Sequence, residues 1–431
     1  MAEQTTPAPP SSSGPGNAAF VFILVMVAFD FLAFGIIAPV LPDLIRQFEG
    51  GDFGRASAIT GYLLFAWNAM QFLFSPILGA WSDRFGRRPI ILLSCFGLGI
   101  DYIVMALAPT LSWLFVGRII SGITASNIST AFAYVTDVTP PEKRAKPFGY
   151  VSAALGLGFV IGPAVGGYLG NFHIRAPFWV AAGLSLVNSL YGFFVLPESL
   201  PPERRAKSAW HMANPLRSLT LLRSHAQLAG LSVVVTLYYL AHTSLPSMWA
   251  LYTMKRYDWS KGDVGLSLAV VGVCASLISG VLVGPFVKRF GERRSVLFGL
   301  LCGTLGFAGF ALATRGWVLY AVIPFIALWG IAAPAVQSLM SRRVDHSSQG
   351  KLQGAINSLR AVTGMAGPVL FTQVFALAIA PATRIHLPGA PYYLAAILLL
   401  SSLLQAVYVT RPGAETELPA AQPAASFDPS D

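Results

Sequence analysis

Residues 79–88, GAWSDRFGRR, and residues 284–293, GPFVKRFGER, are two versions of one segment and decide the fold. The shift between them is 205 residues, and the same shift relates a second pair of segments farther along the chain. The matched positions are Gly79/Gly284, Arg84/Arg289, Phe85/Phe290, Gly86/Gly291, Arg88/Arg293, Lys146/Lys351, Gly149/Gly354, Gly162/Gly367 and Pro163/Pro368. This agreement predicts a duplicated helical unit in parallel topology, and substrate sites in such duplicated folds lie near the membrane midplane between the repeats.

The composition around these segments is that of a membrane protein. Hydrophobic residues make up 55% of the 431 residues and charged residues only 11%, against roughly 25% charged in soluble domains. A membrane-crossing helix needs about 20 apolar residues. Twelve such stretches occur, at 18–44, 56–80, 89–109, 111–136, 147–170, 176–196, 226–253, 263–287, 295–314, 316–340, 351–380 and 390–410. The ten-residue alternation of barrel strands is absent, so we expect an all-α protein with twelve transmembrane helices in two pseudo-symmetric six-helix bundles.

The distribution of Lys and Arg predicts the orientation in the membrane. With the N-terminus in the cytoplasm, 19 of the 29 basic residues fall on the cytoplasmic side, 8 on the other side and two, Arg118 and Arg360, within spans. The positive-inside rule therefore places both termini in the cytoplasm of a multi-pass inner-membrane protein. The predicted parts are a disordered tail (1–17), a six-helix bundle (18–196), a cytoplasmic linker (197–225), a second bundle (226–411) and a disordered tail (412–431).

The central linker has two interpretations. Trp210, Leu216, Leu219 and Leu222 could form the apolar face of a helix on the lipid surface. Alternatively, the segment is a plain solvated linker. The sequence does not decide between them.

Several functional classes are excluded by composition and motifs. The net charge is +10, but the basic residues lie in short clusters between apolar runs. Such clusters are expected to set the orientation of the helices in the membrane, and they do not form the continuous basic surface of a nucleic-acid-binding protein. The three cysteines lie in apolar segments without a C-x-x-C pair, so neither a disulfide nor a metal site is expected. We find no HExxH, G-x-S-x-G or nucleophile–base set, and therefore expect neither an enzyme nor a cofactor.

The segment at 79–88 is a candidate cytoplasmic gate. Its members are Gly79, Asp83, Arg84, Gly86, Arg87 and Arg88. Gly79 is expected to let a neighbouring helix approach, and Gly86 to permit a tight turn. Asp83 is expected to pair with an arginine or to cap a helix, forming a latch between bundles. The simpler alternative is that the arginines only set topology.

Three charged residues within spans are candidates for proton coupling. A membrane-buried charge costs at least about 2.5–3.5 kcal/mol, so Asp30, Asp101 and Arg118 each require a reason. Asp101 and Arg118 lie at similar depth on consecutive antiparallel helices, which favours a salt bridge. Arg118 could instead face Asp30 and lower its proton affinity. Asp30 itself is a candidate proton carrier or partner of a substrate amine.

Polar side chains within other spans are candidates for substrate binding. They are Asn68, Gln71, Asn127, His242, Gln337, Asn357 and Arg360. Histidine titrates near physiological pH, and amides in spans either line a pocket or hold helices together. The sequence does not separate these two roles.

These motifs resemble the major facilitator superfamily. Residues 79–89 are similar to its signature loop, GRIISGIT at 117–124 to its second motif, and LGLGFVIGPAVGGYLG at 155–170 to the signature of its proton-driven drug antiporters. The residues of this antiporter motif are Gly158, Gly162, Pro163, Gly166 and Gly167. Nearly the whole chain, including FDFLAFGIIAPVLPDL at 29–44, resembles the tetracycline/proton antiporters of Gram-negative bacteria. The resemblance implies a monomer that exchanges protons for a small organic molecule, such as a drug, an antibiotic or a metabolite.

Three positions depart from that family. Its span-eight histidine falls on Ala275 and its span-nine aspartate on Gly303, while Arg360 replaces an uncharged residue. The resemblance therefore predicts efflux by the same architecture without fixing tetracycline as the cargo. The alternatives are a proton-coupled symporter or facilitator that imports a metabolite, and a non-transporting membrane receptor or scaffold. No loop has the size of a soluble sensing domain, which argues against a receptor.

Overall fold

The computed structural model describes residues 17–206, 221–222, 226–345, 348–381, 383 and 386–411. The predicted tails, apart from Asn17, and the greater part of the central linker lie outside the described residues. So do Trp210, Leu216 and Leu219 of the predicted surface helix.

Within the described residues every regular element is helical, as the sequence predicts. The α-helices are α1 (Asn17–Ile37), α2 (Leu41–Phe48), α3 (Phe53–Phe85), α4 (Arg87–Leu107), α5 (Leu111–Thr124), α6 (Asn127–Val138), α7 (Ala145–Phe172), α8 (Ala176–Val195), α9 (Ala226–His242), α10 (Ser244–Tyr257), α11 (Lys261–Leu277), α12 (Val283–Leu312), α13 (Gly316–Ala327), α14 (Ala332–Ser341), α15 (Gln349–Ala378) and α16 (Ala390–Val409). Short η segments are η1 (Pro141–Lys143), η2 (Pro202–Arg204), η4 (Ile278–Leu282) and η5 (Leu328–Ile331).

Eleven helical runs in the described part of the chain are long and apolar enough to cross a membrane. One of them, Lys261–Leu312, has 52 residues, and at about 1.5 Å per residue it exceeds twice the thickness of a hydrocarbon core. It contains Gly291, whose φ of 77° breaks the helical path. The equivalent Gly86, with a φ of 109°, separates α3 from α4. The two repeats thus make the same turn at the same place.

Four spans predicted as continuous are broken within the membrane-crossing stretch. The stretch 18–44 divides into α1 and α2 at Ala38–Val40, where Pro39 and Pro42 disfavour a continuous helix. The stretch 111–136 divides at Ala125–Ser126, 226–253 at Thr243, and 316–340 at η5. Hydropathy alone does not detect such breaks, because the residues at a break are as apolar as their neighbours.

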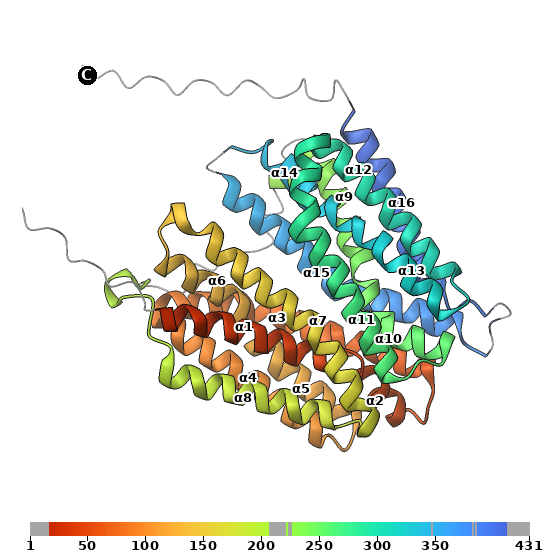
Figure 1. Ribbon diagram of the computed structural model, residues 1–431, viewed down its shortest axis with the longest axis horizontal. Coiled ribbons are helices and arrows are strands. Elements are labelled where there is room, and N and C mark those ends of the chain that lie inside the picture. Colours follow the sequence, from red (N-terminus) through yellow and green to blue (C-terminus); the bar gives the residue numbers. More distant parts are fainter. Residues whose placement is uncertain are drawn as a thin grey trace, which may run out of the picture.

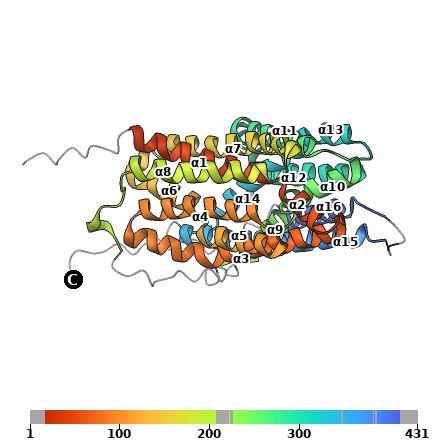
Figure 2. The ribbon, with the colours of Figure 1, turned by 90° about the horizontal axis from the view of Figure 1, so that it is seen from below.

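Helices of each repeat pack mainly among themselves. In the first half, α1 packs on α7 and α8, and α4 on α5 and α8; in the second, α16 packs on α9 and α12, and α9 on α15. Figure 1 shows the first set at the lower left and the second at the upper right. The halves meet where α7 packs on α11 and α3 on α15, and Figure 2 shows α7 and α11 side by side from a second direction.

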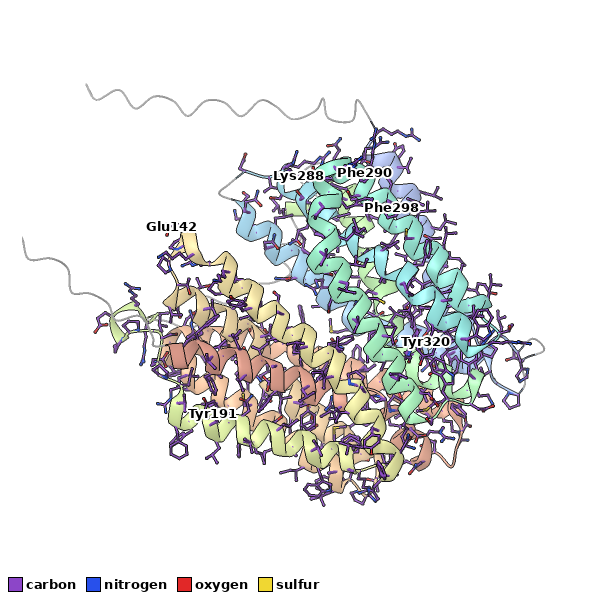
Figure 3. The ribbon with its side chains drawn as sticks, in the orientation of Figure 1. Glu142, Tyr191, Lys288, Phe290, Phe298 and Tyr320 are labelled. Atoms are coloured by element: carbon purple, nitrogen blue, oxygen red, sulfur yellow. The ribbon has the colours of Figure 1, made fainter. Side chains whose placement is uncertain are left out.

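Polar contacts between the halves gather at the end of the molecule where α2, α10 and α11 lie. Asp43 Oδ2 is 3.1 Å from Lys261 Nζ, and Ser57 Oγ donates to the Thr372 carbonyl at 2.9 Å. At the opposite end the halves diverge, with Glu142 and Lys288 on separate arms in Figure 3. Large apolar side chains such as Tyr191 are exposed on the outer surface, as expected of helices that face lipid.

Candidate functional site

Asp30 forms the centre of a buried polar cluster in the first half. Its side chain lies in the middle of α1 and the residue is 7% exposed. Asn127 Nδ2 donates to Asp30 Oδ2 at 2.5 Å, and Asn188 Nδ2 donates to Asp30 Oδ1 at 3.3 Å. Among the described residues no cation pairs with this carboxyl group. Asp30 is therefore held by two neutral amides, and a bound proton would remove its charge without breaking an ion pair.

The two amides were not assigned this position by sequence reasoning. Asn127, predicted to bind substrate, begins α6 and contacts Asp30 instead. Asn188 was missed, although an asparagine amid the apolar residues of α8 was a detectable signal. It is fully buried and also donates to the Met26 carbonyl at 3.2 Å, so it ties α8 to α1.

Asp101 and Arg118 form a second buried cluster. The guanidinium pairs with the Asp101 carboxylate, with exposed fractions of 6% and 0% for the two side chains. Arg118 Nη2 also lies 3.1 Å from Met105 Sδ. Of the two carboxylates considered as partners of Arg118, the structure pairs it with Asp101 and not with Asp30.

Arg87 organises the turn at the predicted gate. It donates to Asp83 Oδ1 at 2.5 Å and to Asp137 Oδ2 at 3.0 Å. Glu198 accepts from the backbone N–H groups of Arg87 at 2.8 Å and Arg88 at 3.2 Å. A carboxylate at the N-terminus of α4 is favourably placed in the field of the helix dipole.

The sequence analysis did not identify two acidic residues of this gate. Asp137 and Glu198 were not singled out; they lie 50 and 111 residues from Arg87, so no local pattern links them to it. Gly79 was expected to admit a neighbouring helix; in this arrangement, with the halves diverging at that end, a Cβ there would meet no described atom within 4 Å. Arg84 lies over the Phe85 ring, 5.2 Å from its centroid.

The second half has an equivalent ion pair of opposite polarity. Arg342 Nη2 lies 2.6 Å from Glu292 Oε1. The repeat shift of 205 carries Arg87 to Glu292 and Asp137 to Arg342, so acid and base have exchanged places.

The glycines of the antiporter motif allow close helix packing in two directions. A Cβ on Gly158 would lie 2.8 Å from the Ala28 carbonyl, and one on Gly162 would lie 2.7 Å from the Gly35 Cα, so these face α1, as does Gly166. A Cβ on Gly167 would lie 3.1 Å from the Gly265 Cα in α11. Small residues let backbones approach in membranes, and here they join α7 both to its own half and to the second half.

A cavity of about 670 Å³ opens among helices of the second half. It is lined by Tyr238, Tyr239, His242, Thr243, Ala275, Ser279, Val283, Gly330, Ala333, Pro334, Arg360, Thr363 and Gly364. Two predicted substrate-binding residues, His242 and Arg360, are among these. The Arg360 guanidinium carbon lies 5.0 Å from the centroid of the Tyr239 ring.

The remaining predicted pocket residues lie near the cavity or apart from it. Gln337 lines a smaller pocket that shares Tyr238 and Tyr239 with the cavity, and donates to Gln353 at 2.7 Å. The Asn68 amide oxygen would lie 3.1 Å from a Cβ on Gly364, a lining residue. Gln71 and Asn357 are not among the lining residues.

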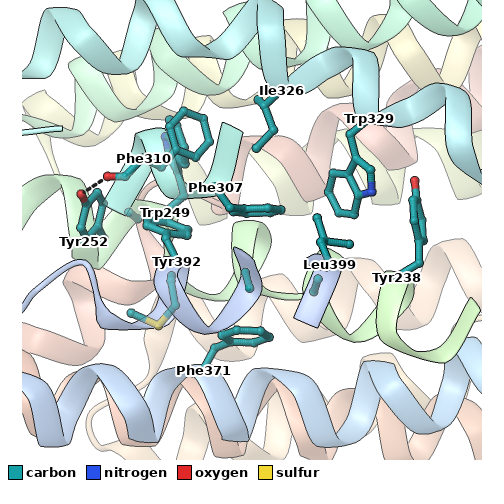
Figure 4. Close-up of a cluster of buried hydrophobic side chains, with 14 of the residues drawn as sticks. Tyr238, Trp249, Tyr252, Phe307, Phe310, Ile326, Trp329, Phe371, Tyr392 and Leu399 are labelled. Carbon is teal, nitrogen blue, oxygen red and sulfur yellow. Dashed lines mark hydrogen bonds between the residues drawn. The ribbon is translucent and has the colours of Figure 1, made fainter. Parts of the chain in front are cut away.

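Two of the three positions that depart from the family, Ala275 and Gly303, lie in different surroundings. Ala275 lines the cavity, whereas a Cβ on Gly303 would lie 2.8 Å from Trp329 Cδ1. Trp329 is packed between Tyr238 and Phe307, at ring-centroid distances of 4.7 and 5.3 Å (Figure 4). The indole thus fills the space that a side chain at position 303 would need.

Comparison with known proteins fits this arrangement. Residues 23–368 match the Major Facilitator Superfamily. The chain belongs to this superfamily. The transporter is 40% identical over 360 residues to the tetracycline resistance protein, class C, of Escherichia coli, covering 84% of this chain and 90% of the relative. The class E protein of Escherichia coli is 34% identical over 397 residues, covering 89% and 95%.

Solved structures of transporters share the fold. The nucleoside transporter NupG has a TM-score of 0.70 at 13% identity, covering 91% of this chain and 98% of that one. An inward-facing bacterial homologue of the human lysosomal transporter Spinster has a TM-score of 0.72 at 18% identity, covering 90% and 96%. These findings confirm the predicted family and a multi-pass transporter that is not an enzyme. The relatives agree with the predicted class, a proton-coupled drug antiporter.

Proposed function

We propose that the transporter exports a small organic molecule across the bacterial inner membrane in exchange for protons, by alternating access. Its twelve spans would form two six-helix bundles, the run Lys261–Leu312 counting as two spans divided at Gly291. The excess of Lys and Arg supports cytoplasmic termini, and a monomer remains the expectation from the family.

The observation that carries the proposal is the contrast between two buried carboxyl groups. Asp101 is already neutralised by Arg118, so losing its charge would strand a buried guanidinium. Among the described residues, the hydrogen-bond partners of Asp30 are the amides of Asn127 and Asn188. Asn127 Oδ1 and Asn188 Oδ1 have no partner among the described residues. A carboxylate accepts from amide N–H groups, and a protonated carboxyl donates to an amide oxygen once the amide turns. The cluster therefore suits both protonation states of Asp30.

The contacts between the halves support alternating access. Asp43–Lys261 and Ser57–Thr372 close one end, which the Lys and Arg count assigns to the outer side. The diverging end carries the Arg87 network. Breaking the first set and closing the second would expose a central site to the opposite side, as in folds built from rocking repeats.

The tetracycline resistance relatives supply the first cargo to test. A cavity of about 670 Å³ lies in the range of drug-sized sites, about 300–1,000 Å³. Tetracycline is therefore the first probe, although Ala275 and Gly303 remove titratable groups that the family resemblance implies.

Purified protein in liposomes tests the antiport. With the lumen acidified and the cytoplasmic face outward, external tetracycline should enter while protons leave, as reported by a pH dye in the lumen. Asp30→Asn should abolish the coupled proton movement. Glu142→Gln, which neutralises an exposed carboxylate in η1, should leave the coupled proton movement unchanged. Tetracycline uptake without proton release, or full coupling in Asp30→Asn, would contradict the proposal.

A further inference from the structure

The charge on the cavity lining is positive. Among the described residues its lining includes Arg360 and His242 but no Asp or Glu. Arg360 is exposed, and no carboxylate among the described residues pairs with it. Its described neighbour is the face of Tyr239. A guanidinium facing an open cavity within the second half, without a counter-ion from the protein, leaves its donors for a ligand.

A second unsatisfied donor belongs to Trp329, which is not itself a lining residue but packs behind two residues that are. Trp329 is 4% exposed, and its Nε1 has no acceptor among the described residues. Its ring lies 4.7 Å from that of Tyr238 and 5.6 Å from that of His242, both of which line the cavity. In Figure 4 the indole nitrogen is on the side of Tyr238. Buried donors of this kind require an acceptor from water or ligand.

Side-chain packing opposes the introduction of an acidic residue at position 303. A carboxylate at position 303 would have to displace Trp329, because the indole already lies 2.8 Å from where a Cβ would be. Ala275, another lining residue, has a side chain with neither a charge nor a hydrogen-bonding group. The cavity therefore presents aromatic faces, donors and one permanent positive charge.

We propose that this cavity binds aromatic anions, with the carboxylate, sulfonate or enolate group on Arg360 and the ring against Tyr239 and His242. A planar guanidinium forms two parallel hydrogen bonds to such a group. The binding follows from the cavity alone, and only the direction of transport rests on the function proposed above.

An anionic cargo changes the energetics of export. The cytoplasm is electrically negative, so an anion leaving the cell moves with the membrane potential, whereas a cation moves against it. Export of an anion therefore requires less of the driving force that proton exchange through titratable side chains would supply. This accounts for a second half in which the family's histidine and aspartate positions are Ala275 and Gly303.

Two bicyclic probes of matched size test the charge preference. Purified transporter in detergent is titrated with 2-naphthalenesulfonate and with N-methylquinolinium, and binding is followed by their fluorescence. The anion should bind at least about tenfold more tightly, since a bidentate charged contact is among the stronger interactions. Arg360→Gln should weaken anion binding at least about tenfold and remove the preference. Arg360→Lys should keep part of it, because an ammonium is a point charge without the fork.

Matched controls separate this from a general charge effect. Arg55→Gln removes the same charge from a side chain that is 75% exposed, outside the cavity, and should bind both probes like the wild type. Each variant is first compared with the wild type in thermal unfolding and gel filtration. If Arg360→Gln does not fold, Arg360→Lys carries the comparison.

Equal or tighter binding of the cation, no binding of the anion up to about 10 mM, or an unchanged preference in Arg360→Gln would overturn the proposal. The assay has no proton gradient. Anion binding without proton-coupled transport would contradict only the antiport, and coupled transport with a preference for the cation would contradict only this inference.

Discussion

The two halves of the transporter share one repeat and differ in what they bury. All charged residues that are buried in the described part of the chain, Asp30, Asp43, Asp101 and Arg118, belong to the first half. The second half buries aromatic rings and holds the cavity with Arg360 at its wall. The helical scaffold is therefore common to both halves, whereas the buried charges of the first half and the cavity of the second half differ between them, and these are the groups to which we assign proton exchange and cargo binding in the proposals above.

The turns at Gly86 and Gly291 show what duplication keeps. Both glycines have positive φ at equivalent positions, because the backbone path is part of the scaffold. The ion pairs beside them have exchanged polarity, Arg87–Asp137 against Glu292–Arg342. Coulomb attraction is indifferent to which partner carries which sign, so the pair can be kept while its members change.

The largest expected effect is on the stability of the first half. Asp101→Asn leaves Arg118 buried without its counter-charge, and breaking a buried pair in this way costs about 3–5 kcal/mol. Thermal unfolding in detergent should show a large decrease in the unfolding temperature of the single variant. The double variant Asp101→Asn with Arg118→Met should recover much of this decrease. A single variant as stable as the wild type would show that the pair is not a structural element.

Asp30→Asn should instead affect transport and spare stability. An asparagine keeps an oxygen for the amides of Asn127 and Asn188 but binds no exchangeable proton. We expect the rate of proton-driven transport to fall at least about 100-fold, which corresponds to an increase of about 2.7 kcal/mol in the activation free energy. The unfolding temperature should change little. Loss of stability equal to that of Asp101→Asn would remove the distinction between the two carboxyl groups.

Gly303→Asp tests whether the second half excludes the family's acid by packing. The new side chain must displace Trp329, and overpacking costs about 1–3 kcal/mol. Tryptophan fluorescence and thermal unfolding should both change. Gly284→Ala is the control, since a Cβ there meets nothing within 4 Å. An aspartate accepted at 303 without loss of stability would mean that Trp329 moves freely.

The smallest effect on stability is expected from exchanging the acidic and basic members of an ion pair. Arg342→Glu should cost about 0.2–1 kcal/mol, because Arg342 is 72% exposed. Adding Glu292→Arg should restore most of this, because the Ser338 hydroxyl, which donates to Glu292 at 2.7 Å, can also accept from an arginine. The same exchange at Arg87 and Asp137 should not be restored, since Arg87 also donates to Ser82 and Asp83. A double-mutant cycle on unfolding measures both couplings, and equal recovery in the two halves would show that the extra partners contribute nothing.

Features that depend on local composition and on repetition were predictable from the sequence alone. Hydropathy is a property of neighbouring residues, so it gave the helical class and the approximate spans; the repeat gave the glycine turns; the motifs gave the family. The breaks at 38–40, 125–126 and 243 were missed, because a change of backbone direction leaves no mark on average hydropathy.

The partners of the candidate functional side chains could be identified only from the folded arrangement of the helices. Arg118 could reach either of two carboxylates by depth, and helix packing placed it on Asp101. Asn188 reaches Asp30 across 158 residues of chain, and Trp329 blocks position 303 from another helix. Such choices depend on distances between helices that are remote in sequence, and those distances are set by the packing of all the side chains between them.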